Sequence, residues 1–257
     1  MNDALTIERL YDLRLGAMAE AFSEEVGRSG DPELSFAERF GLLVERQWSS
    51  REEGRLARRL KAAQLRMEAS VEEVDFRSAR GLDRGAFLEL AELGFLRGAG
   101  NVIITGATGL GKTYLACALA DRALRRGHTA LYRRVPKLVF ELALARADGS
   151  YLKALEKLAR VELLLLDDWG LAQVEGQAAN DLMDVVDDRA GVRATVIASQ
   201  LPVSDWHHLI ADPSIADAVL DRLVHRSVRI ELTGESMRRR AANKETELTW
   251  SRTVRQR

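Results

Sequence analysis

The stretch from Gly106 to Thr113 constrains this chain more than any other. It reads Gly-Ala-Thr-Gly-Leu-Gly-Lys-Thr and fits G-x-x-x-x-G-K-[ST], the pattern of a phosphate-binding loop. Its glycines let backbone N–H groups approach a triphosphate closely. The flanks fit as well, because residues 101–105 predict a buried strand and residues 114–120 predict a helix. The N-terminus of that helix would point its partial positive charge at the phosphates.

The loop predicts a nucleoside triphosphate and Mg²⁺ as ligands. Lys112 would reach the β- and γ-phosphates, which makes it a catalytic candidate, and the Thr113 hydroxyl would ligate Mg²⁺. The residues expected to bind the nucleotide are Gly106, Thr108, Gly109, Leu110, Gly111, Lys112, Thr113 and Tyr114.

The composition excludes several classes of protein. A content of 46% hydrophobic and 30% charged residues fits a folded soluble protein and not a disordered one. The net charge of −1 means that any contact with nucleic acid must come from a local patch. The longest aliphatic run, residues 163–166, is too short to span a membrane, and the N-terminus lacks the pattern of a signal peptide. The one cysteine, Cys117, suits a reducing compartment, so we expect a cytoplasmic protein.

Strand-like and helix-like segments alternate from residue 101 onward. The predicted strands are residues 101–105, 129–133, 161–166, 194–198 and 228–232. Such alternation implies right-handed crossovers and a parallel five-stranded sheet with helices on both faces, an α/β fold.

The first 75 residues have a different, wholly helical pattern. Ser35 and Glu38 have the spacing of a capping box. Phe36, Phe40, Leu43 and Val44 would share an apolar helix face. Residues 76–100 form a connector interrupted by glycines. We therefore predict a helical N-terminal domain at residues 1–75 and an ATPase domain at residues 76–257 with a basic C-terminal tail.

Two acidic residues follow the third predicted strand. Asp167 would hold Mg²⁺ directly or through water, and Asp168 would polarise the attacking water. Acids after a strand are common at turns, but this pair is the expected complement of the phosphate-binding loop.

Basic residues gather on a helix predicted to run from Arg51 to Met67. Its apolar side is formed by Leu56, Leu60, Ala63 and Met67. Residues 55–66 include five basic side chains and no acidic one. This face is either a solvated helix surface or a contact to DNA phosphates. The candidate DNA contacts are Arg51, Arg55, Arg58, Arg59, Lys61 and Arg66.

These motifs resemble those of a known group of ATPases. Residues 76–245 look like an AAA+ ATPase, and nearly the whole chain resembles the IstB-type transposition helper ATPases, relatives of the DnaC-type helicase loaders. The stretches that carry the resemblance are residues 106–113, 163–170, 198–202, 216–223 and 234–238, together with the helix around Arg58. The resemblance implies an AAA+ core behind a small all-helical N-terminal domain.

The resemblance also implies roles for single residues. Ser199 or Gln200 would be the sensor-1 residue that orients the attacking water. Arg222 would be an arginine finger, which stabilises the transferring phosphoryl group of a neighbouring subunit. Arg238 would be the sensor-2 residue. The water-activating position of AAA+ proteins usually holds Glu, and the shorter Asp168 implies slow turnover.

The function implied is that of a DNA-dependent helper. With ATP, the chain would form a homo-oligomeric ring or spiral on duplex DNA, deform it and recruit a cognate transposase. The alternatives are a DnaC-type loader of a replicative helicase and a nucleotide-gated DNA-binding scaffold without useful hydrolysis.

Overall fold

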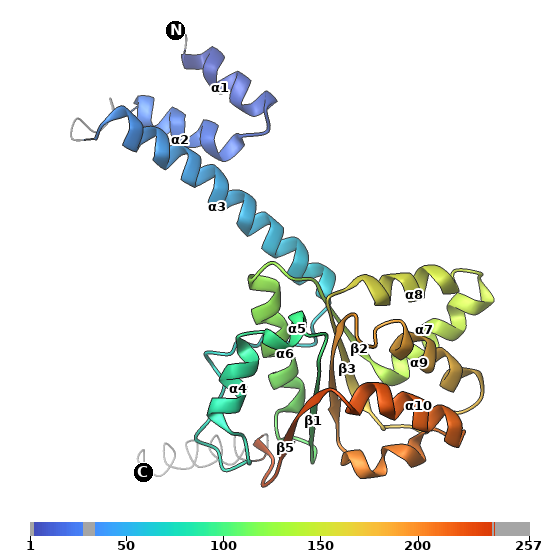
Figure 1. Ribbon diagram of the computed structural model, residues 1–257. Coiled ribbons are helices and arrows are strands. Elements are labelled where there is room, and N and C mark those ends of the chain that lie inside the picture. Colours follow the sequence, from blue (N-terminus) through green and yellow to red (C-terminus); the bar gives the residue numbers. More distant parts are fainter. Residues whose placement is uncertain (1–2, 28–33, 238, 240–257) are drawn as a thin grey trace, which may run out of the picture. The chain divides into compact units, whose positions relative to one another are not determined.

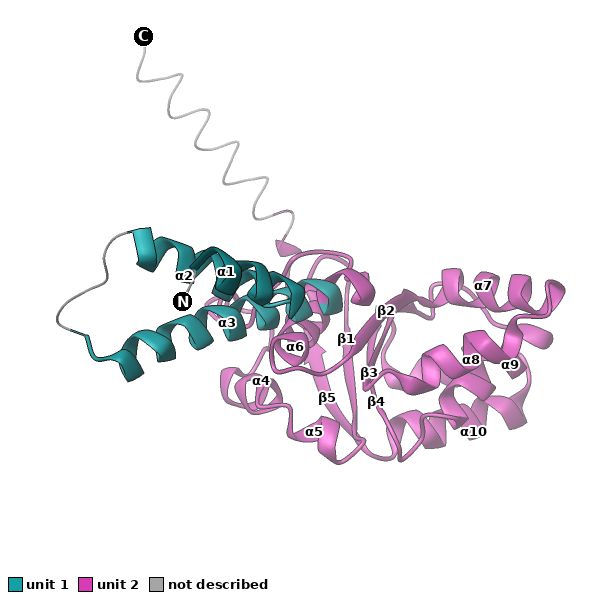
Figure 2. Cartoon of the chain, turned by 90° about the horizontal axis from the view of Figure 1, so that it is seen from above, with its two compact units in different colours: residues 1–59 teal, residues 60–257 magenta. Residues whose placement is uncertain are grey.

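The chain consists of two compact units. The computed structural model describes residues 3–27, 34–237 and 239 and divides the chain into residues 1–59 and 60–257 (Figure 2). The sequence suggested a boundary near residue 75. Residues 60–75 belong instead to the second unit, where the Tyr114 hydroxyl donates to the Ser70 carbonyl (3.4 Å) and Arg122 pairs with Glu72 (3.0 Å).

The first unit is built from helices α1 (Asp3–Asp12), α2 (Gly16–Gly27) and the first part of α3 (Phe36–Ala63). The predicted capping box is confirmed, because the Glu38 carboxylate accepts from the Ser35 backbone N–H (2.8 Å) and the Ser35 hydroxyl accepts from the Glu38 N–H (3.4 Å). The α2 backbone is tied to α3 where the Met18 N–H donates to Gln47 Oε1 (3.1 Å).

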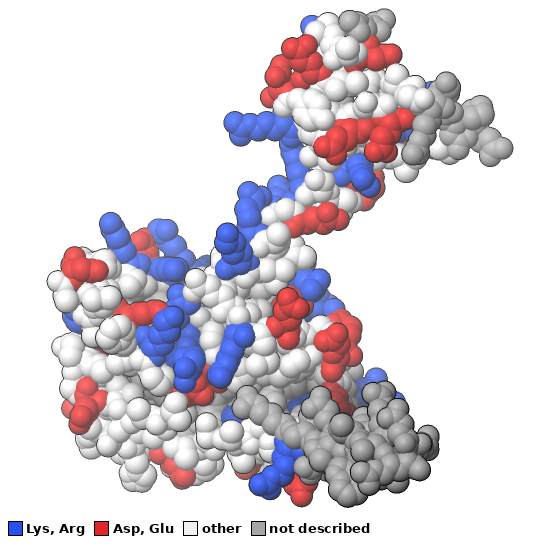
Figure 3. Space-filling model, turned by 180° about the vertical axis from the view of Figure 1, so that it is seen from behind, with Lys and Arg blue, Asp and Glu red and all other residues white. Residues whose placement is uncertain are grey.

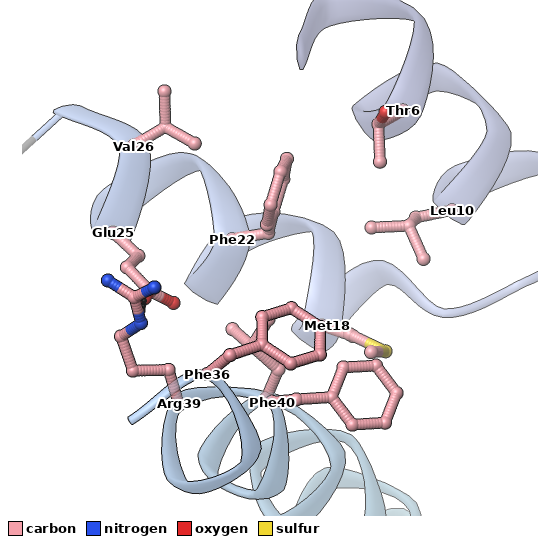
Figure 4. Close-up of a pocket in the computed structure, with 10 residues that line it drawn as sticks. Thr6, Leu10, Met18, Phe22, Glu25, Val26, Phe36, Arg39 and Phe40 are labelled. Atoms are coloured by element: carbon pink, nitrogen blue, oxygen red, sulfur yellow. Dashed lines mark ion pairs between the residues drawn. The ribbon is translucent and has the colours of Figure 1, made fainter. Parts of the chain in front are cut away.

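An apolar groove lies among these three helices. Figure 4 shows Phe22 and Met18 of α2 beside Phe36 and Phe40 of α3, around a cavity of about 390 Å³. The ion pair between Arg39 and Glu25 (3.3 Å) borders it. Of the predicted apolar face, Leu43 is buried, whereas Phe36 and Phe40 are 75% and 48% exposed. Only part of that face is therefore covered within this unit.

Helix α3 ends earlier than the sequence predicted. It stops at Ala63, because Gln64 adopts the left-handed conformation (φ 53°), and residues 64–83 contain no regular helix. The prediction of helix throughout residues 1–75 is therefore wrong for this segment, and Arg66 and Met67 do not continue the faces of α3. The connector beyond it holds α4 (Arg84–Ala91), capped by Asp83, and the short α5 (Gly94–Arg97).

The second unit is built on a parallel five-stranded sheet, which confirms the predicted fold. Its strands are β1 (Asn101–Gly106), β2 (Ala130–Arg134), β3 (Leu163–Trp169), β4 (Ala194–Ser199) and β5 (Ser227–Leu232). They lie in the order β2-β3-β4-β1-β5, and each neighbouring pair is parallel. The residues of β1, β3 and β4 are almost all buried, as strands covered on both faces should be.

Helices cover both faces of this sheet. Figure 1 shows α4, α5 and α6 (Lys112–Arg125) on one face and the helices from α7 to α10 on the other. The second group comprises α7 (Val135–Ala147), α8 (Tyr151–Arg160), α9 (Gln177–Asp187) and α10 (Pro213–Val224), with a 3₁₀ helix at Val203–Leu209 before α10. Among the described residues, no helix combines the length and the apolar character needed to cross a membrane.

One buried arginine joins several of these elements. Arg189 is 2% exposed, and its guanidinium donates to the carbonyls of Leu158 (2.5 Å), Val161 (2.9 Å) and Ala194 and to the Thr195 hydroxyl (3.2 Å). It thereby satisfies acceptors at the end of α8 and at the start of β4, most of which are buried.

We expect Arg189→Met to destabilise the second unit by about 2–4 kcal/mol, because several buried acceptors would lose their donor while the packing volume is roughly kept. Urea denaturation measures this loss. As a control, Arg160→Met removes an exposed arginine that pairs with Glu156 one turn away, and it should cost no more than about 0.5 kcal/mol. Equal midpoints for the two variants would show that the buried network does not stabilise the fold.

Candidate nucleotide-binding site

The loop between β1 and α6 has the shape of a phosphate cradle. Gly109 and Gly111 adopt φ values of 88° and 90°, which side chains rarely allow. A Cβ on Gly109 would lie 2.1 Å from Ser236 Oγ, and one on Gly111 would lie 2.6 Å from Arg80 Nη1. The loop can therefore curl only because these positions are glycine, and the N-terminus of α6 opens directly after it.

Lys112 lies at the first position of α6 with its amine turned back over the loop. Its Nζ donates to the carbonyls of Gly106 (2.6 Å) and Ala107 (2.9 Å). The side chain is 8% exposed, so a cation is held at low dielectric where an anion would be attracted strongly.

Thr113 and Asp167 meet, although they come from different parts of the chain. The Thr113 hydroxyl donates to the Asp167 carboxylate, at 2.9 Å from Oδ2, and the Tyr132 hydroxyl donates to the same oxygen at 2.8 Å. Burial, and then the hydrogen bond to Asp167, raise the pKa of Tyr132, so its phenol stays a donor. A hydroxyl beside a carboxylate is the set of hard oxygen ligands that Mg²⁺ prefers, so these residues fit the ion.

Asp168 is held by two arginines. Arg134, at the end of β2, places Nε 2.5 Å from Asp168 Oδ2. Arg66 places Nη1 3.8 Å from the same oxygen and 3.4 Å from Asp167 Oδ2. The Asp168 backbone has φ 56°, a conformation uncommon for a residue with a side chain and often found at functional sites.

Of the two sensor-1 candidates, the structure brings only Gln200 to the phosphate loop. Its Oε1 accepts from the Thr108 hydroxyl at 2.7 Å. Ser199 is 1% exposed, donates to the Trp169 carbonyl (2.8 Å) and accepts from the Leu201 N–H (3.1 Å), which is a structural set of bonds at the strand end. Trp169 itself is buried.

A cavity of about 380 Å³ lies between the phosphate loop and the acid pair. Four basic side chains and two carboxylates line it, a balance that suits a nucleotide with its metal: Arg66, Arg80, Lys112, Arg134, Asp167 and Asp168. Thr108, Gly109, Gly111, Thr113, Tyr114 and Gln200 line it as well.

Other predicted ligands take supporting positions around this cavity. The Leu110 carbonyl accepts from Arg80 Nη1 (2.8 Å), and burial lowers the pKa of that arginine. The Tyr114 hydroxyl donates to Glu73 Oε2 (3.3 Å) in the segment that follows α3. The Met237 N–H donates to the Gly109 carbonyl (2.9 Å), which joins the start of the C-terminal segment to the loop. Arg238, the sensor-2 candidate, lies outside the described residues.

Arg222 lies away from this cavity. On α10, its Nε pairs with Asp187 at 2.5 Å and its Nη1 donates to the Ala218 carbonyl at 3.0 Å.

The basic residues of α3 are mostly exposed, and Figure 3 shows Lys and Arg side chains projecting along this helix. Arg51, Arg55, Arg58 and Lys61 are exposed, and Arg59 is half-buried. The expectation that Arg66 shares their face is wrong, because α3 ends before it and its guanidinium lies at the acid pair.

Sequence reasoning missed Arg66, Arg80, Tyr132 and Arg134 as groups of this site. For Tyr132 and Arg134 a signal was present. Arg134 ends the strand next to β3 and Tyr132 lies two residues before it, and the carboxyl ends of parallel strands meet at one edge of a sheet. Arg66 and Arg80 lie in the connecting segment, where no periodicity indicates a direction.

Comparison with known sequences identifies the relatives. Residues 8–245 match the family described as IstB-like ATP binding protein. A putative insertion sequence ATP-binding protein of Sinorhizobium fredii is 48% identical over 239 residues, 93% of this chain and 98% of the relative. The IS21 putative ATP-binding protein of Pseudomonas aeruginosa is 30% identical over 243 residues, 95% of this chain and 91% of the relative.

Solved structures show the same fold. The crystal structure of DnaI matches with a TM-score of 0.56 and 24% identity, over 65% of this chain and 92% of that one. AMPPCP-bound DnaA from Aquifex aeolicus matches with a TM-score of 0.56 and 19% identity, over 72% of this chain and 56% of that one. The fold of the second unit is thus that of AAA+ proteins, and the chain belongs to the family of IstB-like ATP-binding proteins.

Proposed function

We propose that this protein is an ATP-hydrolysing helper of transposition, which assembles on duplex DNA, deforms it and recruits a cognate transposase. The observation that carries the proposal is the meeting of Thr113, from the phosphate loop, with Asp167, from β3 (2.9 Å). Relatives named as insertion sequence ATP-binding proteins support the link to transposition, and they favour it over helicase loading. We propose that the protein acts in the cytoplasm, where both ATP and DNA are available.

The residues divide the work of hydrolysis between them. The loop amides and Lys112 hold the phosphates, and Thr113 with Asp167 would hold Mg²⁺, which supplies charge neutralisation at the β- and γ-phosphates. Asp168 accepts the proton of the attacking water, and Gln200 orients that water. The water oxygen bonds to the γ-phosphorus while the bond to the ADP oxygen breaks. Asp168 is shorter than the usual Glu, so we expect slow turnover.

Neighbouring subunits complete the site. Arg222 of one subunit would stabilise the charge on the phosphoryl group bound by the next, and Arg238 would report the nucleotide of its own chain. ATP would then lie at the interface between subunits. The binding of ATP and the assembly of subunits into a ring or spiral would therefore be thermodynamically linked.

Assembly strengthens a weak DNA contact. Each subunit offers a few exposed basic residues on α3, and subunits aligned on one duplex add their phosphate contacts by avidity. Nothing on this helix specifies bases, so we expect weak sequence preference.

We expect Asp168→Asn to lower the rate of phosphate release at least about 100-fold, because the amide cannot take the proton of the water. ATP binding should stay within about threefold of wild type, because the phosphate contacts are untouched. The complex on DNA should persist longer, since hydrolysis would no longer dismantle it. Steady-state phosphate release and binding of a fluorescent ATP analogue measure the two effects.

The matched control is Lys112→Ala, which should lose ATP binding itself. If Asp168→Asn hydrolyses ATP at the wild-type rate, another group activates the water.

Replacing Arg55, Arg58 and Arg59 by Ala should weaken duplex binding equally for unrelated sequences. It should also flatten the log–log salt dependence by about 0.9 for each DNA phosphate that the variant no longer neutralises. A salt titration of duplex binding measures both quantities, and basal ATP binding should be unchanged because the phosphate loop is in the other unit.

The control removes the same charge elsewhere, by Ala substitution of Arg77, Arg84 and Arg97, which are in the connector. Equal slopes and affinities for wild type and the α3 variant would show that this face is only solvated.

A further inference from the structure

Arg66 is anchored at both its backbone and its side chain. Its guanidinium lies 3.4 Å from Asp167 Oδ2 and 3.8 Å from Asp168 Oδ2. The backbone of Arg66 and Met67 is hydrogen-bonded to the Cys117 thiol on α6. Burial raises the pKa of that thiol to about 11, and these hydrogen bonds lower it in part. Gln64 is held too, because its Oε1 accepts from Arg133 Nη1 (2.8 Å). The segment therefore presents Arg66 to the acid pair in a defined way.

Arg66 and the metal would compete for one carboxylate. Asp167 Oδ2 already accepts from Thr113 (2.9 Å) and Tyr132 (2.8 Å), and Arg66 faces that same oxygen. The guanidinium of Arg66 is charged at any physiological pH. A cation this close to a ligand oxygen opposes the arrival of a divalent cation by Coulomb repulsion.

Arg66 is also close in sequence to the helix with the basic face. Helix α3 ends at Ala63, and only Gln64 and Leu65 separate it from Arg66. Three residues of extended chain span no more than about 11 Å. A movement at the end of α3 would therefore be transmitted to Arg66, because two intervening residues are too few to absorb it.

We propose that Arg66 is a positioning residue that ties the basic helix α3 to the acid pair and makes the site respond to DNA. Without DNA, its guanidinium stays on Asp167 and Asp168, which hinders metal binding. When duplex DNA engages α3, Arg66 leaves the acid pair and no longer competes with the metal for Asp167. The DNA part of this inference rests on the proposed function, whereas the competition with the metal does not.

The first test needs no hydrolysis and no DNA. A fluorescent non-hydrolysable ATP analogue is bound at increasing Mg²⁺ concentration, and the Mg²⁺ midpoint is compared among variants. Arg66→Ala should lower the midpoint at least about threefold, because the competing cation is gone. Arg66→Lys keeps the charge and should stay near wild type. Arg77→Ala, which removes another arginine of the same connecting segment, should leave the midpoint unchanged.

The second test adds duplex DNA. In the wild type, DNA should lower the Mg²⁺ midpoint toward that of Arg66→Ala and should stimulate phosphate release. In Arg66→Ala, the midpoint should no longer respond to DNA, basal release should rise, and stimulation should fall to about onefold. Circular dichroism establishes that each variant is folded.

An unchanged midpoint in Arg66→Ala without DNA would overturn the proposal, and so would a full DNA response in that variant. The proposed function and the proposed role of Arg66 can be contradicted independently of each other. A wild type that binds the analogue but never releases phosphate would contradict ATP hydrolysis, while a lowered midpoint in Arg66→Ala would still support the contact of Arg66 with the acid pair.

Discussion

The hydrogen bond from the Thr113 hydroxyl to the Asp167 carboxylate (2.9 Å) is the contact on which the rest of this site depends. It joins the first turn of α6 to the end of β3, although β4 lies between β1 and β3 in the sheet. Parallel strands bring their carboxyl ends to one edge, so a loop after β1 and acids after β3 converge there without any further device. The five-stranded sheet is, in this sense, the scaffold that lets two oxygen ligands meet.

The charges around this contact balance one another, and a ligand can still replace the partners of each charged group. Lys112 is turned back onto its own loop, and Arg66 and Arg134 lie on the acid pair. These cations compensate the buried carboxylates, which would otherwise be costly at low dielectric. A nucleotide with its metal would bring its own charges and would compete for the same partners. Binding therefore exchanges ion pairs inside the protein for ion pairs with the ligand.

The sequence predicted the sheet and the loop well, because both depend on local pattern. Five apolar runs gave strands close to those observed, and Gly109 and Gly111 have the backbone conformations that the loop requires. The end of α3 could not be predicted in this way. Residues 60–67 contain good helix formers, so their sequence favours a longer helix. The helix nevertheless ends before Gln64, which has a left-handed backbone conformation and a side chain that accepts from Arg133. The roles of Arg66, Arg80 and Gln200 arise from contacts between distant residues, which no local pattern contains.

The central claim is that ATP is hydrolysed at a site shared by two subunits. The most direct measurement mixes Arg222→Ala with Lys112→Ala, two variants that each lack one side of the site, and follows phosphate release on duplex DNA. With equal mixing we predict recovery of about a quarter of the wild-type rate, because about one site in four pairs an intact loop with an intact finger. Mass photometry first establishes that the mixed assemblies contain both variants. Mixed assemblies that release no more phosphate than either variant alone would contradict a shared site.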